Sequence, residues 1–278
     1  MHVCYTVSMN IRKKVGLALG SGGPRGFAHI GVIKALLDHH VPIDIITGCS
    51  AGALIGGLYA SLGSIAEVEK IATSLTKKDL LWVFSDIGFP SGIIQGKNIT
   101  EFIQKFLHHI LIESLPKPFA TVATDLSTGN TVDLTSGNLA TAIHASFAIP
   151  IMFEPVFLQN TYMIDGGCSS PIPIRTAKKL GADIVIAVNL DSYPLLEVDN
   201  KNGIKKPSFK DAGVATMNFF RYNLAKELCN VSDIIIVPDV STISSLNLLQ
   251  LFQGEHVIKK GYDATIAQMP AIKRSISI

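Results

Sequence analysis

A serine held between two glycines is the first feature with clear chemical potential. The run Gly48-Cys49-Ser50-Ala51-Gly52 directly follows the apolar stretch Ile43–Ile46. At a strand-to-helix corner such glycines permit a strained backbone and leave the serine hydroxyl without bulky neighbours. The free N–H groups and positive dipole end of the following helix would favour an oxyanion there. The pattern indicates a nucleophile, and a plain Gly/Ser turn is the alternative.

A glycine-rich loop precedes this serine in the chain. The apolar run Val15–Leu19 stops at Gly20-Ser21-Gly22-Gly23-Pro24-Arg25-Gly26, and apolar residues then recur at helical spacing from Phe27 to Leu37. Glycine loops that enter helices bind anions. Arg25 stands where a dinucleotide fingerprint needs its last glycine, and the loop lacks the G-K-S/T ending of a P-loop. An oxyanion loop or a bare turn remains.

Composition limits the classes of function. Hydrophobic residues make up 47% of the 278 residues and charged residues 17%, which suits a sheet buried on both faces. The formal net charge of +2 gives no basic field for nucleic acid. The four cysteines form no C-x-x-C pair, so we expect reduced thiols, an intracellular protein and no metal site.

The chain reads as one domain without a linker. We expect residues 1–14 to form a flexible tail, with Met9 as an alternative start, and residues 15–272 to form the domain. The first residues lack the apolar run of a secretory signal, and no stretch has the length of about 18 apolar residues that a membrane span needs.

The order and spacing of these motifs resemble those of the patatin-like phospholipase family. The resemblance rests on Gly20–Gly26 followed by Phe27-Ala28-His29-Ile30-Gly31, and on Gly48–Gly52 followed by Ala53-Leu54. A third family motif is matched by Asp165-Gly166-Gly167 after the strand-like Thr161–Ile164. The stretches Ala123-Thr124-Asp125-Leu126 and Ala145–Pro150 are also similar to bacterial members, so the likeness runs from about Val15 to Pro173.

This resemblance implies a single three-layer α/β/α domain with a mostly parallel central sheet, and a serine hydrolase of lipid esters that needs no metal or organic cofactor. It implies that Ser50 is the nucleophile and Asp165 the base of a Ser-Asp dyad. Backbone N–H groups of Gly22, Gly23 and Ala51 would hold the oxyanion. The supporting loop residues would be Gly20, Ser21, Arg25, Gly26, Gly48, Gly52, Gly166 and Gly167.

The sequence departs from the family pattern at three positions. Ser21 and Pro24 replace residues that are commonly glycine and a small apolar residue, and His144 stands where arginine is frequent. The first two substitutions would alter the geometry of the glycine loop. We expect Arg25 to brace that loop, with contact to a substrate phosphate as the alternative.

The remaining periodicity supplies packing elements. Strands are expected at Ile43–Thr47, Phe119–Asp125, Thr131–Leu134, Ile184–Asn189 and Asp233–Val237. Helices are expected at Ile65–Leu75 and over Leu246–Ile266. A capping box at Asn98 and Glu101 predicts a further helix that runs to about Leu115, with His108 and His109 on its face. The tail at Lys273–Ile278 is expected to be frayed.

Two segments have lipid contact only as an alternative interpretation. The apolar stretch Leu80–Ile94 has no clean period, and core packing under a loop is the favoured interpretation over a flap on an acyl groove or a membrane-touching surface. The lysines at 201, 205, 206 and 210 indicate a solvated loop, with anionic headgroups as an alternative partner.

Three other functions compete with a Ser-Asp lipid hydrolase. An α/β-hydrolase triad would use Ser50, Asp165 or Asp233, and His256, but only two strand-like runs precede Ser50 and His256 falls in a helical stretch. A lipid-binding module without turnover and a lipid acyltransferase are the others. We expect a lipid or acyl-ester substrate. The mostly apolar, untagged chain suggests the cytoplasm or the inner face of a membrane.

Overall fold

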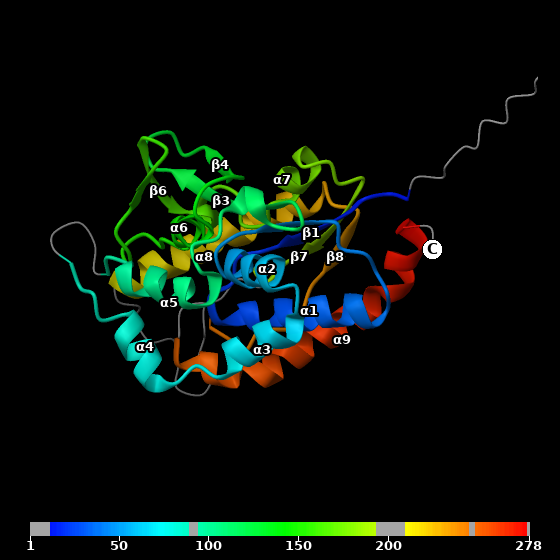
Figure 1. The fold of residues 1–278 in the computed structure, drawn as a ribbon, viewed down its shortest axis with the longest axis horizontal. Coiled ribbons are helices and arrows are strands. Elements are labelled where there is room, and N and C mark those ends of the chain that lie inside the picture. Colours follow the sequence, from blue (N-terminus) through cyan, green and yellow to red (C-terminus); the bar gives the residue numbers. More distant parts are fainter. Residues whose placement is uncertain (1–11, 89–93, 193–208, 245–247, 277–278) are drawn as a thin grey trace, which may run out of the picture.

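The structure is a computed structural model, and it describes residues 12–88, 94–192, 209–244 and 248–276. Within this part of the chain eight strands form one sheet in the order β5-β6-β3-β2-β1-β7-β8, with β4 also paired to β3 (Figure 1). The strands are β1 Val15–Leu19, β2 Ile45–Gly48, β3 Phe119–Asp125, β4 Thr131–Leu134, β5 Val156–Leu158, β6 Thr161–Asp165, β7 Ile184–Val188 and β8 Ile234–Ile236.

Helices connect and cover these strands. They are α1 Phe27–Asp38, α2 Ala51–Leu62, α3 Ile65–Thr73, α4 Lys77–Val83, α5 Lys97–Leu107, α6 Leu139–Ser146, α7 Ile174–Lys179, α8 Phe209–Cys229 and α9 Gly254–Ile276. Short 3-10 helices are η1 Gly23–Gly26, η2 Ile112–Ser114, η3 Gly166–Cys168 and η4 Leu248–Gln253.

The sheet is mostly parallel and buried on both faces. β1, β2, β3, β7 and β8 are parallel, while β4 and β6 are antiparallel to β3 and β5 is antiparallel to β6. Along β1, Leu17 and Leu19 join the core that also contains residues of α1, α2 and α9, whereas Ala18 joins the smaller core with α7 and α8. This alternation places helices on both faces, so the predicted three-layer α/β/α architecture is confirmed.

Most predicted strands lie where the sequence placed them. The two strands on either side of the turn at residues 126–130 form the β3–β4 hairpin with unchanged bounds. β2 begins and ends slightly later than expected, because it continues into Gly48 at the corner that precedes Ser50. The helix predicted at Ile65–Leu75 is α3, whose buried residues are Val68 and Ala72.

The capping box predicted at Asn98 is wrong. The N-cap of α5 is Gly96 in the left-handed region at φ 79°, and a side chain there would overlap the His144 ring. Asn98 instead donates its side-chain N–H to the carbonyl of Trp82 at 2.7 Å. The helix ends at Leu107 rather than near Leu115, because His108 and His109 both adopt positive φ.

The two predicted tails lie at the ends of the described residues. Most of the N-terminal tail, residues 1–11, lies outside the described part, and Arg12 forms an ion pair with Asp44 at 2.6 Å. At the other end α9 continues to Ile276, which is buried, so the predicted fraying from Lys273 is wrong.

Candidate active site

Strand register brings the three motifs to one edge of the sheet. Leu19 at the end of β1 pairs with Gly48 at the end of β2, and Gly48 pairs with Thr121 of β3. Asp165, the last residue of the antiparallel β6, lies opposite Ala123, two residues further along β3. The glycine loop, the serine corner and the aspartate therefore meet beyond the carboxyl ends of the parallel strands, where ligands bind in open α/β sheets.

Ser50 occupies a strained corner between β2 and α2. Its backbone lies at φ 52° and ψ −115°, a region that residues other than glycine rarely adopt. The chain can turn so tightly because Gly52 packs against the Leu19 carbonyl, leaving no space for a side chain. The corner presents Ser50 at the first turn of α2, where the N–H of Ala51 has no intrahelical partner.

The N–H of Ser50 is held by a residue that sequence reasoning missed. It donates to Oγ of Ser146 at 2.9 Å, and that hydroxyl donates to the Val122 carbonyl at 2.7 Å. Ser146 is fully buried at the end of α6. Its stretch Ala145–Pro150 attracted notice only through the family resemblance, and nothing in the local pattern separates its hydroxyl from that of an ordinary helical serine.

Replacing Ser146 with alanine is expected to destabilise the fold by about 1–3 kcal/mol, because the Ser50 N–H loses its partner in a buried site. Activity toward a short ester should fall as the corner loosens. Urea unfolding and steady-state kinetics measure both effects. Ser61→Ala is the matched control, since the Ser61 hydroxyl is buried without a hydrogen bond. Equal stability of the two variants would contradict the bracing role.

Asp165 is buried and faces the serine. The N–H of Gly167 donates to its carboxylate at 2.5 Å. Burial raises the pKa of Asp165 to about 6, although the nearby Arg221, the Gly167 N–H and the Ser50 side chain favour the anion. A carboxylate with this pKa is ionised at neutral pH and is a stronger base than a solvated aspartate.

A buried ion pair lies near Asp165. Arg221 of α8 donates from Nε and Nη2 to both carboxylate oxygens of Asp191, at 3.2 and 2.5 Å. The hydroxyl of Ser21 donates to the same carboxylate at 2.5 Å, so the serine that replaces the usual glycine links the loop to this pair. Sequence reasoning missed Arg221 and Asp191, because their contact joins residues 30 positions apart on different elements.

The glycine loop is fixed by side chains beneath it. Nε2 of the buried His29 donates to the Gly20 carbonyl at 2.7 Å, and burial lowers the pKa of His29 to about 4, which keeps the ring neutral. Arg25 is 1% exposed and donates to the carbonyls of Ile243 and Leu190. This placement fits a bracing residue and leaves the guanidinium no access to a substrate phosphate.

The loop also places backbone N–H groups at the start of a helical turn. Gly23 is the first residue of η1, where an N–H has no intrahelical partner, and Gly22 precedes it as the N-cap. Pro24 fits this first turn at no cost in hydrogen bonds. A Cβ on Gly26 would meet Cβ of Ala51 at 2.6 Å, so the loop lies directly against the start of α2. The N–H of Gly167 is occupied by Asp165, and Gly166 packs on the Val122 carbonyl.

An apolar pocket opens beside Ser50. Ser50 is the one polar side chain among the described residues that line it. The wall is built from α2, α3, α4, α5 and the segment after α6, and includes Leu54, Leu58, Ile71, Leu80, Val83, Phe102, Phe106, Phe147 and Phe153. In the stretch that begins at Leu80, Ile94 belongs to the buried core, as the favoured interpretation held, and Leu80, Val83 and Phe84 line the pocket. Residues 89–93 of that stretch lie outside the described part.

A family model for patatin-like phospholipases matches residues 17–178, more than half of the chain. The chain belongs to the patatin-like phospholipase family. An uncharacterized NTE family protein of Mycobacterium bovis is 39% identical over 178 residues, covering 64% of this chain and 49% of that protein. A Neurospora crassa lysophospholipase is 32% identical over 199 residues, and the match covers 69% of this chain and 13% of the lysophospholipase.

This patatin-like chain therefore spans about half the length of its mycobacterial relative and a small part of the fungal one. The crystal structure of VipD from Legionella pneumophila superposes with a TM-score of 0.52 at 16% identity, covering 95% of this chain and 67% of that one. At that identity the likeness concerns the fold.

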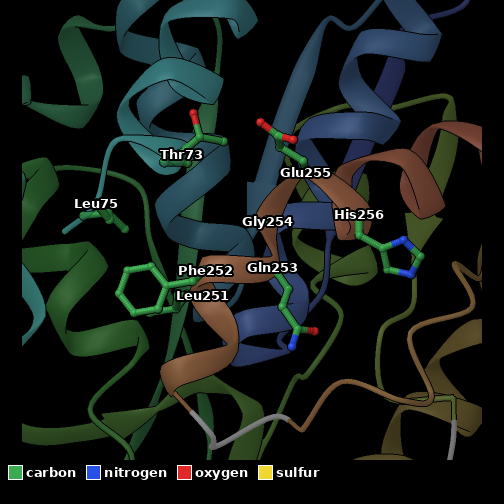
Figure 2. Close-up of a pocket in the computed structure, with 9 residues that line it drawn as sticks. Thr73, Leu75, Leu251, Phe252, Gln253, Gly254, Glu255 and His256 are labelled. Carbon is green, nitrogen blue, oxygen red and sulfur yellow. The ribbon is translucent and has the colours of Figure 1, made fainter. Parts of the chain in front are cut away.

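The histidine of the competing triad lies elsewhere in the patatin-like fold. His256 is exposed on α9 and lines a neighbouring hollow with Thr73, Gln253 and Glu255 (Figure 2). Ala72, Leu75 and Leu251 line both this hollow and the pocket of Ser50. Ser50 is absent from the described lining of that hollow. Asp233 precedes β8 and accepts from the Val185 N–H, which places it near the amino ends of the parallel strands, opposite Ser50.

The remaining predictions concern metal ions, membrane spans and the lysine-rich loop. Among the described residues no group of three or more His, Cys, Asp or Glu side chains is placed to hold a metal, and Cys49, Cys168 and Cys229 are free. No helix in that part of the chain has the length and apolarity to cross a bilayer. The predicted lysine loop at 201, 205 and 206 lies outside the described residues, and Lys210 lies in the first turn of α8.

Proposed function

We propose that this chain hydrolyses carboxylic esters of lipids through a Ser50–Asp165 dyad and an acyl-enzyme. One observation carries the proposal: a strained serine lies close enough to a buried carboxylate to lower the pKa of that group, and it opens onto a pocket whose other described side chains are apolar. The family of the chain supports a lipid as the source of the ester. A lysophospholipid or phospholipid is the substrate class that these features suit best.

In the acylation step Asp165 takes the hydroxyl proton as Oγ of Ser50 attacks the ester carbonyl carbon. The carbonyl oxygen becomes an oxyanion that accepts hydrogen bonds from the N–H groups of Gly22, Gly23 and Ala51. Such preorganised donors contribute about 3–4 kcal/mol each to the transition state in well-studied hydrolases. The tetrahedral intermediate then collapses, the carbon–oxygen bond to the alcohol breaks, and Asp165 returns its proton to the leaving alkoxide.

In the deacylation step a water molecule replaces the alcohol. Asp165 takes a proton from this water as its oxygen attacks the acyl carbon, and the same N–H groups hold the second oxyanion. The bond to Oγ breaks and Ser50 regains its proton from Asp165, which releases the free fatty acid and restores the enzyme. The pocket of Leu54, Phe102 and Phe147 holds the acyl chain away from water throughout.

Lysophosphatidylcholine and a fluorophosphonate test this assignment together. Incubation with the lipid should release free fatty acid, and one equivalent of fluorophosphonate should attach to the Ser50 peptide and stop that release. Glycerol added as an acceptor separates hydrolysis from acyl transfer, because a transferase would form acylglycerol in place of free acid. A folded protein that neither turns over the lipid nor takes the label would favour the lipid-binding module instead.

A further inference from the structure

The outer wall of the apolar pocket carries exposed apolar side chains on its other side. In α4, Leu80 and Val83 line the pocket, whereas Leu81 is 74% exposed and Trp82 is 37% exposed. In the segment after α6, Met152 lines the pocket while the adjacent Ile151 is 69% exposed. Each wall segment therefore has apolar residues on the side that lines the pocket and on the side that faces solvent. Lining the pocket requires apolar residues on the first side only.

These exposed residues belong to one region. Ile87 is 68% exposed and forms an antiparallel bridge with Ile94, which in turn bridges Phe153 and donates its N–H to the Met152 carbonyl. Ile87 follows α4 closely, since its N–H donates to Ser85 and that of Ser85 donates to Trp82. We call Leu81, Trp82, Ile87 and Ile151 the apolar rim. Figure 1 shows α4 and α5 together at one end of the molecule.

The backbone of Ile151 is a second, independent observation. This residue lies at φ 73°, a conformation that β-branched side chains rarely adopt. Core packing does not explain the conformation, because the side chain is largely exposed. Strained residues of this kind are retained where the surroundings or a function require them. Here the strained residue has an exposed apolar side chain and directly precedes Met152 of the pocket wall.

Cationic side chains flank the apolar rim. Lys77 and Lys78 are exposed on α4, and Nζ of Lys105 lies 4.4 Å from the centre of the Trp82 ring. The acidic Asp79 accepts hydrogen bonds from Thr76 as the cap of α4. Asp86 likewise accepts from the Asn98 N–H, Glu101 is an exposed acid on α5, and the carboxylate of the half-buried Glu154 lies beside Gly88. Lysines over an apolar and aromatic face are typical of surfaces that bind anionic membranes.

We propose that the apolar rim docks on a lipid bilayer containing anionic lipids, so that the pocket of Ser50 opens toward the membrane. Leu81, Trp82, Ile87 and Ile151 enter the interface while Lys77, Lys78 and Lys105 meet the headgroups. The occupant is a bilayer rather than a protein because the rim is continuous with a pocket suited to acyl chains and is bordered by cations. The inference rests on the proposed function for the identity of the substrate, but docking itself needs no turnover.

Trp82 reports directly on this docking because it is the single tryptophan in the chain. Vesicles of phosphatidylcholine with phosphatidylglycerol are added to the Ser50→Ala protein, which cannot consume them by the proposed route. We expect the tryptophan emission to shift to the blue and to be quenched by brominated acyl chains. Pure phosphatidylcholine should give weaker binding, since each lysine near an anionic surface adds a favourable term. Unchanged emission with both vesicles would overturn the proposal.

Matched variants separate docking from folding. Leu81→Glu should weaken vesicle binding about tenfold, the effect of roughly 1.4 kcal/mol. Leu126→Glu should not, although Leu126 is also exposed, at 52%, on the turn after β3. Ile151→Asn should weaken binding while raising the melting temperature, because asparagine tolerates positive φ. Equal weakening by the Leu81 and Leu126 variants would overturn the proposal.

A soluble substrate separates this proposal from the proposed function. Wild type and Leu81→Glu should hydrolyse a short-chain p-nitrophenyl ester equally well, while only wild type acts on vesicle lipid at full rate. Vesicle binding without any ester hydrolysis would leave docking intact and remove the hydrolase. Hydrolysis of the soluble ester without vesicle binding would support the hydrolase and overturn the docking proposal.

Discussion

Ser50→Ala is expected to lower kcat/KM for a short-chain p-nitrophenyl ester by about 10⁴-fold or more, to the level of background catalysis by binding and the oxyanion donors. The loss is large because Ser50 would form the covalent intermediate, and no second hydroxyl occupies its place in the pocket wall among the described residues. Purified wild type and variant are compared in the same assay, with circular dichroism as the test of folding.

His256→Ala is the control that addresses the competing triad. His256 is exposed on α9, so this variant should retain wild-type kcat/KM. Ser50→Gly gives a further check, because glycine accepts the backbone at φ 52° without strain. We expect Ser50→Gly to be as inactive as alanine but more stable by about 1 kcal/mol. An active Ser50→Ala protein would remove this serine from the mechanism for that ester.

The motifs were readable from sequence because their geometry is local. A strand that ends at Gly48, a serine two residues later and a helix that begins at Ala51 lie within one short stretch, and backbone sterics dictate the corner. The apolar patterns with a period of two or of a helical turn likewise reflect which faces of a strand or helix are buried, so they can be recognised within a short stretch of sequence. The architecture and its mostly parallel sheet followed from the same local signals together with the family resemblance.

The supporting contacts were not readable, because they join distant positions. Ser146 lies 96 residues from the N–H that it holds, and Arg221 reaches Asp191 from the middle of a long helix. The family resemblance marks the stretch that contains Ser146 but not the role of its hydroxyl, and no sequence pattern marks Arg221. The error at Asn98 has a related cause, since the packing of His144 against Gly96 sets the start of α5 and overrides the local capping signal.

Asp165→Asn is expected to reduce kcat/KM by about 10³-fold, the typical contribution of a general base. Asparagine can still accept the Gly167 N–H, so the loop should keep its shape while the base is lost. Steady-state hydrolysis of the soluble ester measures the loss. Asp239→Asn, a substitution at an exposed aspartate that accepts from Ser241, should leave kcat/KM unchanged.

The pH profile of the wild type tests the same role. Because burial raises the pKa of Asp165 to about 6, kcat/KM should be flat near pH 8 and fall about tenfold per pH unit below about pH 6. The acidic limb should be absent from the residual activity of Asp165→Asn. A wild-type profile that stays flat to about pH 4 would show that no group with this pKa acts as the base.

The raised pKa also predicts that the inactive variant is the more stable protein. A carboxyl whose pKa rises from 3.8 to about 6 on folding stabilises the fold when protonated, and this contribution is lost as pH increases through the folded value. At about pH 8 the buried anion therefore costs about 3 kcal/mol, which asparagine avoids. Asp165→Asn should unfold at higher urea than wild type near pH 8, and the difference should vanish near pH 4. If the variant is destabilised at both pH values, its lost activity reflects damage to the fold and not the removal of a base.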